Sequence, residues 1–420
     1  MTFNAARFLN VLTRSLSSGL TDEQPTVVYV SEIAPINTAA SSVVIFRHLL
    51  SLERLGYRIC VITPEQPGLN DQLPLSWLKL LLPARRAFYP PYRPKRPLMA
   101  IRWRLLDRIV RPVLADLNVH CLIGLLASEY LVNYADWLSR KLPCPLFYFY
   151  HDRGERLHFW NRPNQAKRLR LQNLRLLENP NLRRVWTVSK ELIYPTDRNK
   201  SLFSIVYPLP ERFVAKAPAR QHRGSHAPTL AHIGTVYIEN LPSMRQMLNC
   251  LGERGGRMLL YSQFAESAKI LANDYPEVVR FVGFEPNSEA LLTQIVQEAD
   301  AFFLSYPNLI ETMPWSLNSF PSKFVQLVQT GLPGLIFAPA ETAVGRWCVA
   351  NDWTFYQNHI SPKTICSALD LLGTEEGWLQ GISKSRAAAL GPFDPAMIEN
   401  LVNTDVLSAR PDGEGASTRS

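Results

Sequence analysis

The sequence has few cysteines, and no two of them lie close together. Six cysteines are spread over 420 residues, and none forms a CxxC pair. A disulfide framework or a structural zinc site needs cysteines at short, regular spacings. We therefore expect a reducing compartment, in which the cysteines are small apolar core residues, at positions Cys60, Cys121, Cys144, Cys250, Cys348 and Cys366.

Long hydrophobic runs are also missing. No segment approaches the roughly 18 consecutive apolar residues that a membrane-spanning helix requires. Residues 1–24 contain Arg7 and Arg14 but no unbroken apolar stretch, so a signal peptide is not expected. These absences predict a cytoplasmic protein, and any contact with a membrane is predicted to be peripheral.

Several motifs of nucleotide-binding and hydrolytic enzymes are absent. Residues 31–38 follow the first predicted strand and contain no glycine, whereas a dinucleotide-binding fold needs GxGxxG there so that the backbone can approach the pyrophosphate. The motifs GxxxxGK[ST], GxSxG and HExxH do not occur. A DxD pair, which holds Mn²⁺ or Mg²⁺ in metal-dependent sugar transferases, is missing too. An NAD or FAD enzyme is therefore disfavoured, and we expect no metal or other cofactor.

Acidic residues are outnumbered by basic ones. Lys and Arg total 45 and Asp and Glu total 36, which gives a formal net charge of +9. An excess of cations suggests an anionic partner, which could be nucleic acid, a phosphorylated small molecule or a membrane surface. With 46% hydrophobic residues, the chain is long enough for about two or three domains, each with its own core.

The first half of the chain shows alternating strand and helix patterns. Residues 26–30 form the first predicted strand, and the apolar spacing that follows over 41–55 predicts a helix, which Gly56 ends. Residues 58–63 form the next predicted strand, so the three elements make a βαβ unit with parallel strands. Further strands are predicted in this half over residues 119–125, 146–150 and 185–188.

A second series of strands follows a segment rich in Pro, Arg, His and Gly. These strands are predicted over residues 229–232, 258–261, 279–283, 301–305 and 334–337, with a helix over 289–299 capped at Asn287/Ser288. We therefore expect an α/β fold of two doubly wound, Rossmann-like domains facing a cleft. The expected parts are an N-terminal extension (1–24), a first domain (25–207), a linker (208–228), a second domain (229–404) and a disordered tail (405–420).

The most specific stretch of the sequence is residues 318–326. Pro321 suits the first turn of a helix because its missing N–H would be unpaired there. The free amides of Ser322 and Lys323 at that helix start would attract an anion, and the lysine adds a point charge. Gln326, one turn later, can bind a hydroxyl. The stretch predicts a pocket for a diphosphate with a polar group attached, and an ordinary capped helix with a solvated lysine is the alternative.

This stretch resembles a known family of enzymes. Ser-Phe-Pro-Ser-Lys-Phe at 319–324, with Gly-Leu-Pro at 331–333 and the apolar segment 299–304 before it, is similar to the C-terminal domain of GT-B glycosyltransferases. Retaining members of that superfold have two glutamates separated by seven residues. The matching positions here are Asn318 and Gln326, which are both amides.

A closer resemblance is to the membrane-associated glucuronosyltransferase of xanthan-type exopolysaccharide assembly, an inverting GT-B enzyme. Its donor site has a Ser-x-Lys-x-x-Gln run that ends in Gly-Leu-Pro. The resemblance implies that the second domain binds a nucleotide-sugar, with UDP as the nucleotide, and that the first domain binds the acceptor. The donor-binding residues that it and the helix start together suggest are Gly234, Thr235, Tyr306, Asn318, Ser322, Lys323 and Gln326.

The predicted strand 146–150 would place His151 and Asp152 at the expected cleft, because ligands bind beyond the carboxyl ends of parallel strands. An aspartate there can act as a general base that takes the proton from an acceptor hydroxyl. The inverting relative has an aspartate in a similar place, and His151 would orient Asp152 or contact the sugar. The alternative is a surface salt-bridge cluster with the charged residues that follow.

Residues 76–112 form a basic segment with ten Lys or Arg and one acid, Asp107. A helix from about residue 98 would have a basic stripe beside an apolar face, which suits the interface of an anionic membrane, where each cation contributes about 1 kcal/mol. The alternative is a solvated charge run in an insertion within the first domain. The residues predicted to face the membrane or acceptor are Trp77, Arg85, Arg86, Arg93, Lys95, Arg96, Trp103, Arg104, Arg108 and Arg111.

The sequence thus predicts a peripheral, metal-independent hexosyl-type glycosyltransferase at the inner face of the plasma membrane. It would move a sugar from a nucleotide diphosphate to a hydroxyl of a lipid-linked or polysaccharide acceptor, with inversion favoured over retention. Two alternatives stay open. One is a non-catalytic GT-B-like binding or scaffold protein at the membrane, which the amides at positions 318 and 326 favour. The other is a basic nucleic-acid-binding protein, for which no RNP, KH, zinc-finger or helix-turn-helix signature is found.

Overall fold

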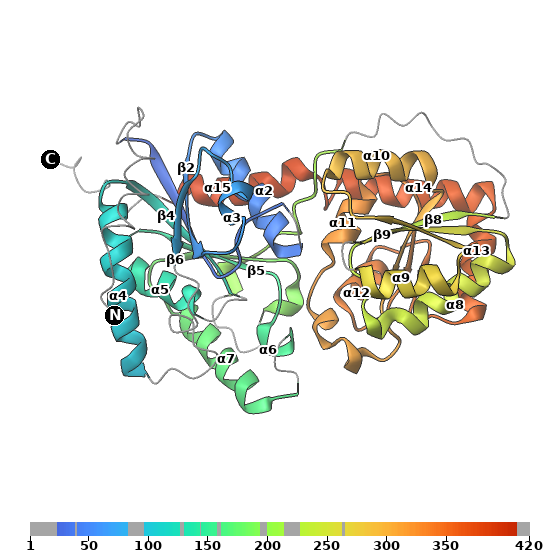
Figure 1. Ribbon diagram of the computed structural model, residues 1–420, viewed down its shortest axis with the longest axis horizontal. Helices are drawn as coiled ribbons and strands as arrows, with labels where there is room; N and C mark the ends of the chain where they lie inside the picture. Colours follow the sequence, from blue (N-terminus) through green and yellow to red (C-terminus); the bar gives the residue numbers. More distant parts are fainter. Residues whose placement is uncertain are drawn as a thin grey trace.

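The computed structural model describes residues 23–37, 40–82, 96–126, 130–142, 144–157, 161–193, 200–213, 227–262 and 265–409. These residues form two parallel sheets, one in each half of the chain, with helices packed against both (Figure 1). The predicted α/β class with two doubly wound domains is confirmed.

The first sheet has seven parallel strands in the order β3-β2-β1-β4-β5-β6-β7. The chain starts at the central strand and adds strands outward on both sides, as a doubly wound sheet does. The strands are β1 (Pro25–Val30), β2 (Arg58–Pro64), β3 (Leu78–Leu82), β4 (Asn118–Leu125), β5 (Leu146–Tyr150), β6 (Leu182–Thr187) and β7 (Phe203–Ile205). The helices are α2 (Ala40–Arg54), α3 (Leu69–Gln72), α4 (Arg96–Ala115), α5 (Leu131–Lys141), α6 (Gly154–Leu157) and α7 (Pro163–Leu176), with the 3₁₀ turns η1 (Lys190–Leu192) and η2 (Lys200–Leu202).

The second sheet has six parallel strands in the order β10-β9-β8-β11-β12-β13 and is wound in the same way. Its strands are β8 (Thr229–Ile233), β9 (Arg257–Tyr261), β10 (Val279–Gly283), β11 (Ala301–Ser305), β12 (Gly334–Phe337) and β13 (Tyr356–Gln357). Its helices are α8 (Leu241–Glu253), α9 (Ala265–Asp274), α10 (Ser288–Glu298), α11 (Ser322–Val328), α12 (Ala343–Ala350), α13 (Pro362–Leu372) and α14 (Glu375–Leu390). The 3₁₀ turns are η3 (Ile238–Asn240), η4 (Ile310–Thr312) and η5 (Pro314–Leu317), and the last helix of the chain is α15 (Pro395–Ser408).

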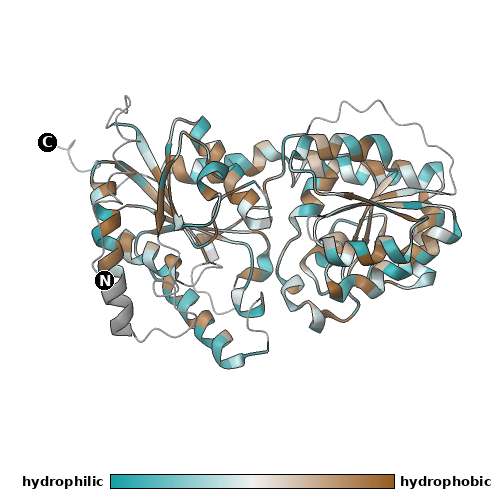
Figure 2. Ribbon diagram, viewed as in Figure 1, coloured by the Kyte–Doolittle hydropathy of each residue, from teal (hydrophilic) through white to brown (hydrophobic). Residues whose placement is uncertain are grey.

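Both faces of the first sheet are buried, because side chains of successive strand residues point to opposite faces. Along β1, Val28 and Val30 belong to the core beneath α4, α5 and α7, and Val27 and Tyr29 belong to the core beneath α2 and α15. Figure 2 shows the result as apolar strands inside and hydrophilic outer helix faces. The prediction of buried cysteines is confirmed for five of them, whereas Cys366 is half-buried.

Helix α15 packs on the first sheet, although it follows the second domain in the chain (Figure 1). Val402 and Val406 lie in the same core as residues of α2 and β6. The indole Nε1 of the buried Trp186 donates to Asp405 Oδ2 at 2.8 Å. Our expected second domain extended to residue 404. The structure instead places α15 with the first domain, because the apolar face of this helix finds its partner there.

The described parts of the segment 76–112, namely residues 76–82 and 96–112, contribute core elements, which contradicts the interpretation of these parts as an insertion. Its first part forms β3, which pairs with β2 at the edge of the sheet. Trp77, which we expected to face a membrane, is 3% exposed and its ring lies 5.5 Å from that of Phe46. On α4 the residues Leu106 and Val110 are fully buried, so the apolar face of this helix covers the sheet. The outer face is the basic one.

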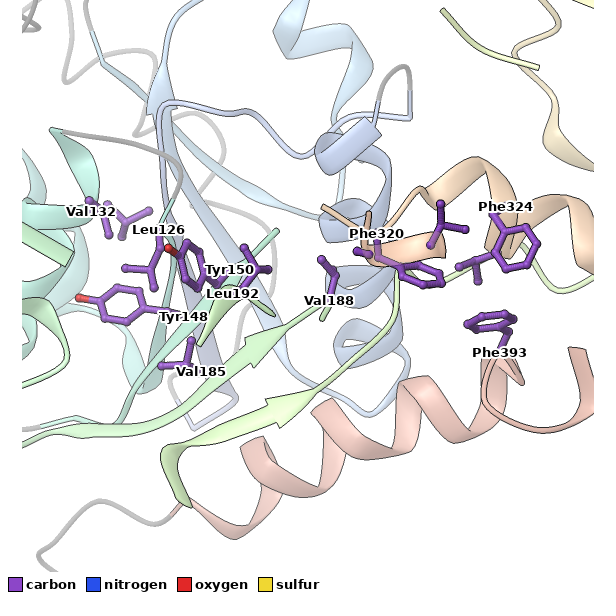
Figure 3. Packing of buried hydrophobic residues seen from close by; sticks show 14 of the residues in the cluster. Leu126, Val132, Tyr148, Tyr150, Val185, Val188, Leu192, Phe320, Phe324 and Phe393 are labelled. Atoms are coloured by element: carbon purple, nitrogen blue, oxygen red, sulfur yellow. The ribbon is translucent and has the colours of Figure 1, made fainter. Parts of the chain in front are cut away.

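The two domains share one continuous hydrophobic core. Figure 3 shows a row of buried side chains that runs from Tyr148 and Leu192 in the first domain through Val188 to Phe320 and Phe324 in the second. The burial of these side chains holds the two domains together. In the part of the chain that the structure describes, no helix is both long and apolar enough to span a bilayer.

Candidate active site

Residues that follow β5 and β6 in the first domain contact residues that follow β11 and β12 in the second. Ser319, just before α11, donates a short hydrogen bond to Asp152 Oδ1. Ser189 Oγ donates to the carbonyl oxygen of Asn318 at 2.5 Å. Arg346 Nε is 2.9 Å from Glu191 Oε1. The structure thus brings the predicted base and the predicted donor motif together.

Asp152 is partly exposed, and its carboxylate is oriented by Ser319, which the sequence analysis did not single out. Two tyrosines of the second domain, Tyr237 and Tyr306, also lie near this carboxylate. Burial raises the pKa of both phenols, and the charge of Asp152 contributes to the rise. Both phenols therefore remain protonated and can donate hydrogen bonds at neutral pH. A carboxylate held in this way can accept a proton from a hydroxyl brought to the domain interface.

His151 precedes Asp152 and is 7% exposed. Burial lowers its pKa to about 4, so the ring is neutral at pH 7. A second histidine that the sequence analysis missed, His48 on α2, lies close to His151, so that burial and also the charge of His151 lower the pKa of His48. Both rings pack on Phe149, at centroid distances of 5.2 Å for His48 and 5.6 Å for His151. Neutral rings leave the charge of Asp152 uncompensated by these histidines.

Lys323 is the second helical residue of α11 and is half-buried. Burial lowers the pKa of its ammonium group to about 8. Among the described residues no carboxylate forms an ion pair with it, and no hydrogen bond of its Nζ is found. An ammonium group in this setting favours an anionic ligand, because such a ligand would supply the missing countercharge. The sequence predicted a helix with Pro321 in its first turn. The structure has a helix there, α11, but it begins at Ser322 and Pro321 occupies the preceding cap position.

Gly234 and Thr235 end the first strand of the second domain beside Lys323. Gly234 has a φ of +85°, which favours glycine, and a Cβ at this position would lie 3.9 Å from Lys323 Cδ. The turn therefore approaches the lysine closely. His232, two residues earlier, is 1% exposed, and burial together with the charge of Lys323 lowers its pKa to about 3. Because His232 is neutral, Lys323 carries the positive charge beside this turn.

The side-chain oxygen of Gln326 is hydrogen-bonded within the protein. Its Oε1 accepts hydrogen bonds from Arg47 Nη1 at 2.8 Å and from the Glu211 amide at 2.9 Å. Arg47 also donates to the Leu209 carbonyl and to Ser288 Oγ, each at 3.0 Å. The buried Nε2 of Gln326 is without a partner among the described residues. Arg47 of α2 thus contacts both domains. Because it occupies Oε1 of Gln326, the Nε2 group is the end of this amide that can donate to a ligand.

Asn318 and Ser322 complete the predicted donor motif. Asn318 is 5% exposed, and its Nδ2 donates to the Glu191 carbonyl at 2.6 Å. This contact, like that of Gln326, holds the second domain against the first. Ser322 is half-buried at the start of α11.

The structure places the residues predicted to face a membrane in different settings. Arg104, Arg108 and Arg111 are exposed on α4, as predicted. Trp103 is half-buried against the core. Arg96 begins α4 in the backbone trace, and the rest lie outside the described residues, namely Arg85, Arg86, Arg93 and Lys95.

No known family model matches this sequence, and no curated protein matches it. Solved structures do match its fold. A sucrose-phosphate synthase from Thermosynechococcus elongatus is 12% identical over 91% of this chain and 98% of its own, with a TM-score of 0.62. HepE from Anabaena, solved with UDP and glucose, is 12% identical over 92% of this chain and 100% of its own, with a TM-score of 0.59.

A glycosyltransferase from Rickettsia africae is similar to the same extent, with 13% identity over 92% of this chain and 100% of its own and a TM-score of 0.62. These matches span both sheets and leave little of either chain uncovered. At such low identity they concern architecture. The two parallel, doubly wound domains of this chain therefore have the GT-B fold of these glycosyltransferases.

Proposed function

We propose that the protein is a glycosyltransferase that moves a sugar from a nucleotide diphosphate to an acceptor hydroxyl. One observation supports this more than any other. Lys323 is a half-buried cation without a carboxylate partner among the described residues, and it follows by four residues Ser319, which donates a hydrogen bond to Asp152. A group that attracts an anion and a group that accepts a proton are thus close together at the domain interface.

In this proposal the acceptor hydroxyl attacks the anomeric carbon of the donor sugar, and Asp152 takes the hydroxyl proton. The bond between that carbon and the diphosphate oxygen breaks, and the leaving diphosphate gains negative charge. Lys323 stabilises that charge, so no metal ion is required. A direct displacement of this kind inverts the anomeric centre, and His151, neutral and buried beside Asp152, contacts the sugar.

We propose UDP as the nucleotide. HepE, which shares the fold, has been solved with UDP and with UDP-glucose. Gly234 lets the backbone approach the diphosphate beside Lys323, and Tyr306 and the free Nε2 of Gln326 contribute hydrogen-bond donors. The sugar is proposed to be a hexose.

We further propose that the acceptor is a lipid-linked or polysaccharide glycan, reached at an anionic membrane at the inner face of the plasma membrane. The outer face of α4 supports this, with Arg104, Arg108 and Arg111 exposed. Helix α7 packs on the same face of the sheet as α4 and adds four exposed cations. These are Lys167, Arg168, Arg170 and Arg175. Several cations on one layer hold a domain at an anionic surface, at about 1 kcal/mol each.

The first test is a thermal-shift panel of UDP, GDP, ADP and CMP in the presence of chelator. A ligand at about 100 times its Kd stabilises the folded state by about 2.7 kcal/mol, which is seen as a higher melting temperature. We expect UDP to raise the melting temperature of the wild type and not of Lys323→Met. Lys384→Met, which removes an exposed lysine of α14, is the matched control and should keep the full shift.

A second candidate function is a non-catalytic binding protein with the same fold. It is favoured by Asn318 and Gln326, whose side chains bridge the domains. UDP binding without any transfer to lipid-linked acceptors by the wild type would support this candidate. No nucleotide shift at all, together with salt-sensitive binding to DNA or RNA, would contradict both candidates.

A further inference from the structure

Two cysteine thiols of the second domain lie side by side on neighbouring helices. Cys250 is in α8 and Cys366 is in α13, and these two helices pack together. One group, Arg254 Nη1, lies 3.4 Å from the Cys250 carbonyl oxygen and also 3.4 Å from Cys366 Sγ, which places the two cysteines next to each other. Cys250 is buried, and its Sγ lies 3.9 Å from the Pro362 carbonyl oxygen, whereas Cys366 is half-buried. Only one thiol of the pair is therefore accessible to a reagent in solution.

A charged pair lies one helical turn beyond the cysteines. Arg254 follows Cys250 by four residues and Asp370 follows Cys366 by four, so the two side chains meet in the same way as the thiols. Arg254 Nη1 is 3.4 Å from Cys366 Sγ, and its Nη2 donates to Asp370 Oδ1 at 3.0 Å. The guanidinium thus places a positive charge and a hydrogen-bond donor directly beside the Cys366 sulfur. Cys250 stays protonated, because burial and the neighbouring Cys366 raise its pKa to about 11.

We propose that Cys250 and Cys366 form an oxidisable dithiol site that closes to a disulfide by exchange with a small disulfide such as oxidised glutathione. The Cys366 thiolate attacks one sulfur of the reagent, forms a mixed disulfide and releases one glutathione thiolate. Cys250 then loses its proton and attacks the Cys366 sulfur, which releases the second glutathione. Two protein thiols are oxidised, one reagent disulfide is reduced, and the two thiol protons end on the two glutathiones.

The other four cysteines lack these features. Cys60, Cys121, Cys144 and Cys348 are at most 5% exposed, and burial raises the pKa of each thiol. A buried, protonated thiol reacts slowly with a disulfide. The reaction should therefore be confined to the pair. This inference does not depend on the proposed glycosyl transfer.

The test is to incubate the reduced full-length protein with oxidised glutathione and then to count free thiols and map linked peptides by mass spectrometry. We expect two of the six thiols to disappear, one peptide joining Cys250 to Cys366, and full reversal by dithiothreitol. The oxidised protein should melt at a temperature several degrees higher, because the link closes a long loop of the unfolded chain.

Three variants sharpen the test. Cys250→Ser should retain one glutathione on Cys366, since the second step is blocked. Arg254→Gln should slow the loss of thiols roughly three- to tenfold, because it removes the positive charge 3.4 Å from the attacking sulfur. Cys348→Ser is the matched control and should form the same link at the same rate. A glutathione that persists on Cys366 in the wild type, a link between other cysteines, or no loss of thiols in the folded protein would each overturn the proposal.

Discussion

His48, His151 and His232 are all buried, and burial lowers the pKa of each to between about 3 and about 4. These three imidazole rings are therefore uncharged around pH 7. Lys323 differs from these histidines, because its lowered pKa of about 8 lies close to neutral pH.

The first prediction at this scale concerns pH. The folded pKa of Lys323, about 8, lies below its ordinary value of 10.5, so the ammonium charge is lost as pH rises through about 8. We expect the affinity for UDP, measured by calorimetry, to fall about tenfold between pH 7 and pH 9. Lys323→Met should bind weakly with no such pH dependence. Equal pH dependence in both proteins would contradict a role for Lys323.

The same pKa has a consequence for stability. Between about pH 8 and pH 10.5 the unfolded chain binds the lysine proton and the folded protein does not, so this group makes the free energy of unfolding rise with pH across that window. At pH 7 the buried charge costs stability. We expect Lys323→Met to raise the melting temperature of the unliganded protein at pH 7, by an amount that shrinks as the pH approaches 10. A lower melting temperature at pH 7 would mean that the ammonium has a stabilising partner.

A further prediction concerns Asp152. Asp152→Asn keeps the size of the side chain and removes the base, so we expect sugar transfer to fall by roughly 10²- to 10⁴-fold with the UDP thermal shift unchanged. Ser319→Ala is the companion variant. It removes only the hydrogen bond that orients the carboxylate and should reduce transfer less. Transfer by Asp152→Asn at the wild-type rate would exclude Asp152 as the base.

The places of Asp152 and Lys323 at the domain interface could be predicted, because Asp152 comes two residues after a buried strand and Lys323 lies in the first turn of a helix preceded by proline. Ser319 and Arg47 could not. Arg47 is 279 residues from Gln326 in the chain, and its contact depends on how two domains meet. For the same reason the two amides expected on the nucleotide, Asn318 and Gln326, turned out to bridge the domains.

At the scale of elements, most strands were predictable because β-branched and apolar runs bounded by polar turns are typical of buried parallel strands. The strand Leu78–Leu82 was missed, because Lys79 and the many cations after it made this stretch look like a solvated insertion. The packing of α15 on the first sheet was not predicted either. An amphipathic pattern shows that a helix has a partner but does not identify the sheet on which it packs.

The docking of α15 gives a prediction at this scale. Asp405→Ala leaves the buried Trp186 Nε1 without its acceptor and breaks the ion pair with Arg184, so we expect the free energy of unfolding to fall by about 1–3 kcal/mol. Chemical denaturation measures it. Asp274→Ala removes a carboxylate from an exposed pair with Arg245 and should cost less than about 1 kcal/mol. Equal losses would mean that Asp405 does not hold α15.

At the scale of the whole molecule, α4 and α7 place several exposed cations on one layer of the first domain, an arrangement that the sequence did not reveal. We expect the triple variant Arg104→Gln, Arg108→Gln, Arg111→Gln to bind vesicles containing anionic lipid about 100-fold more weakly, at about 1 kcal/mol per cation. Vesicle sedimentation measures the affinity. A control triple variant removes exposed cations of the second domain, namely Arg257, Lys269 and Lys363. Equal loss in both would indicate attraction by net charge alone.

Because α15 returns to the first domain, the chain passes between the domains twice. Tyr207 lies on the first passage and Phe393 on the second, and their rings meet edge to face with centroids 4.9 Å apart. Two connecting segments that contact each other at one point act as a hinge. They permit one domain to swing about an axis through that point, but they resist twisting and sliding. Any opening of this molecule should therefore follow a single arc, with the Tyr207–Phe393 pair nearly stationary and the separation of Asp152 from Ser319 changing most.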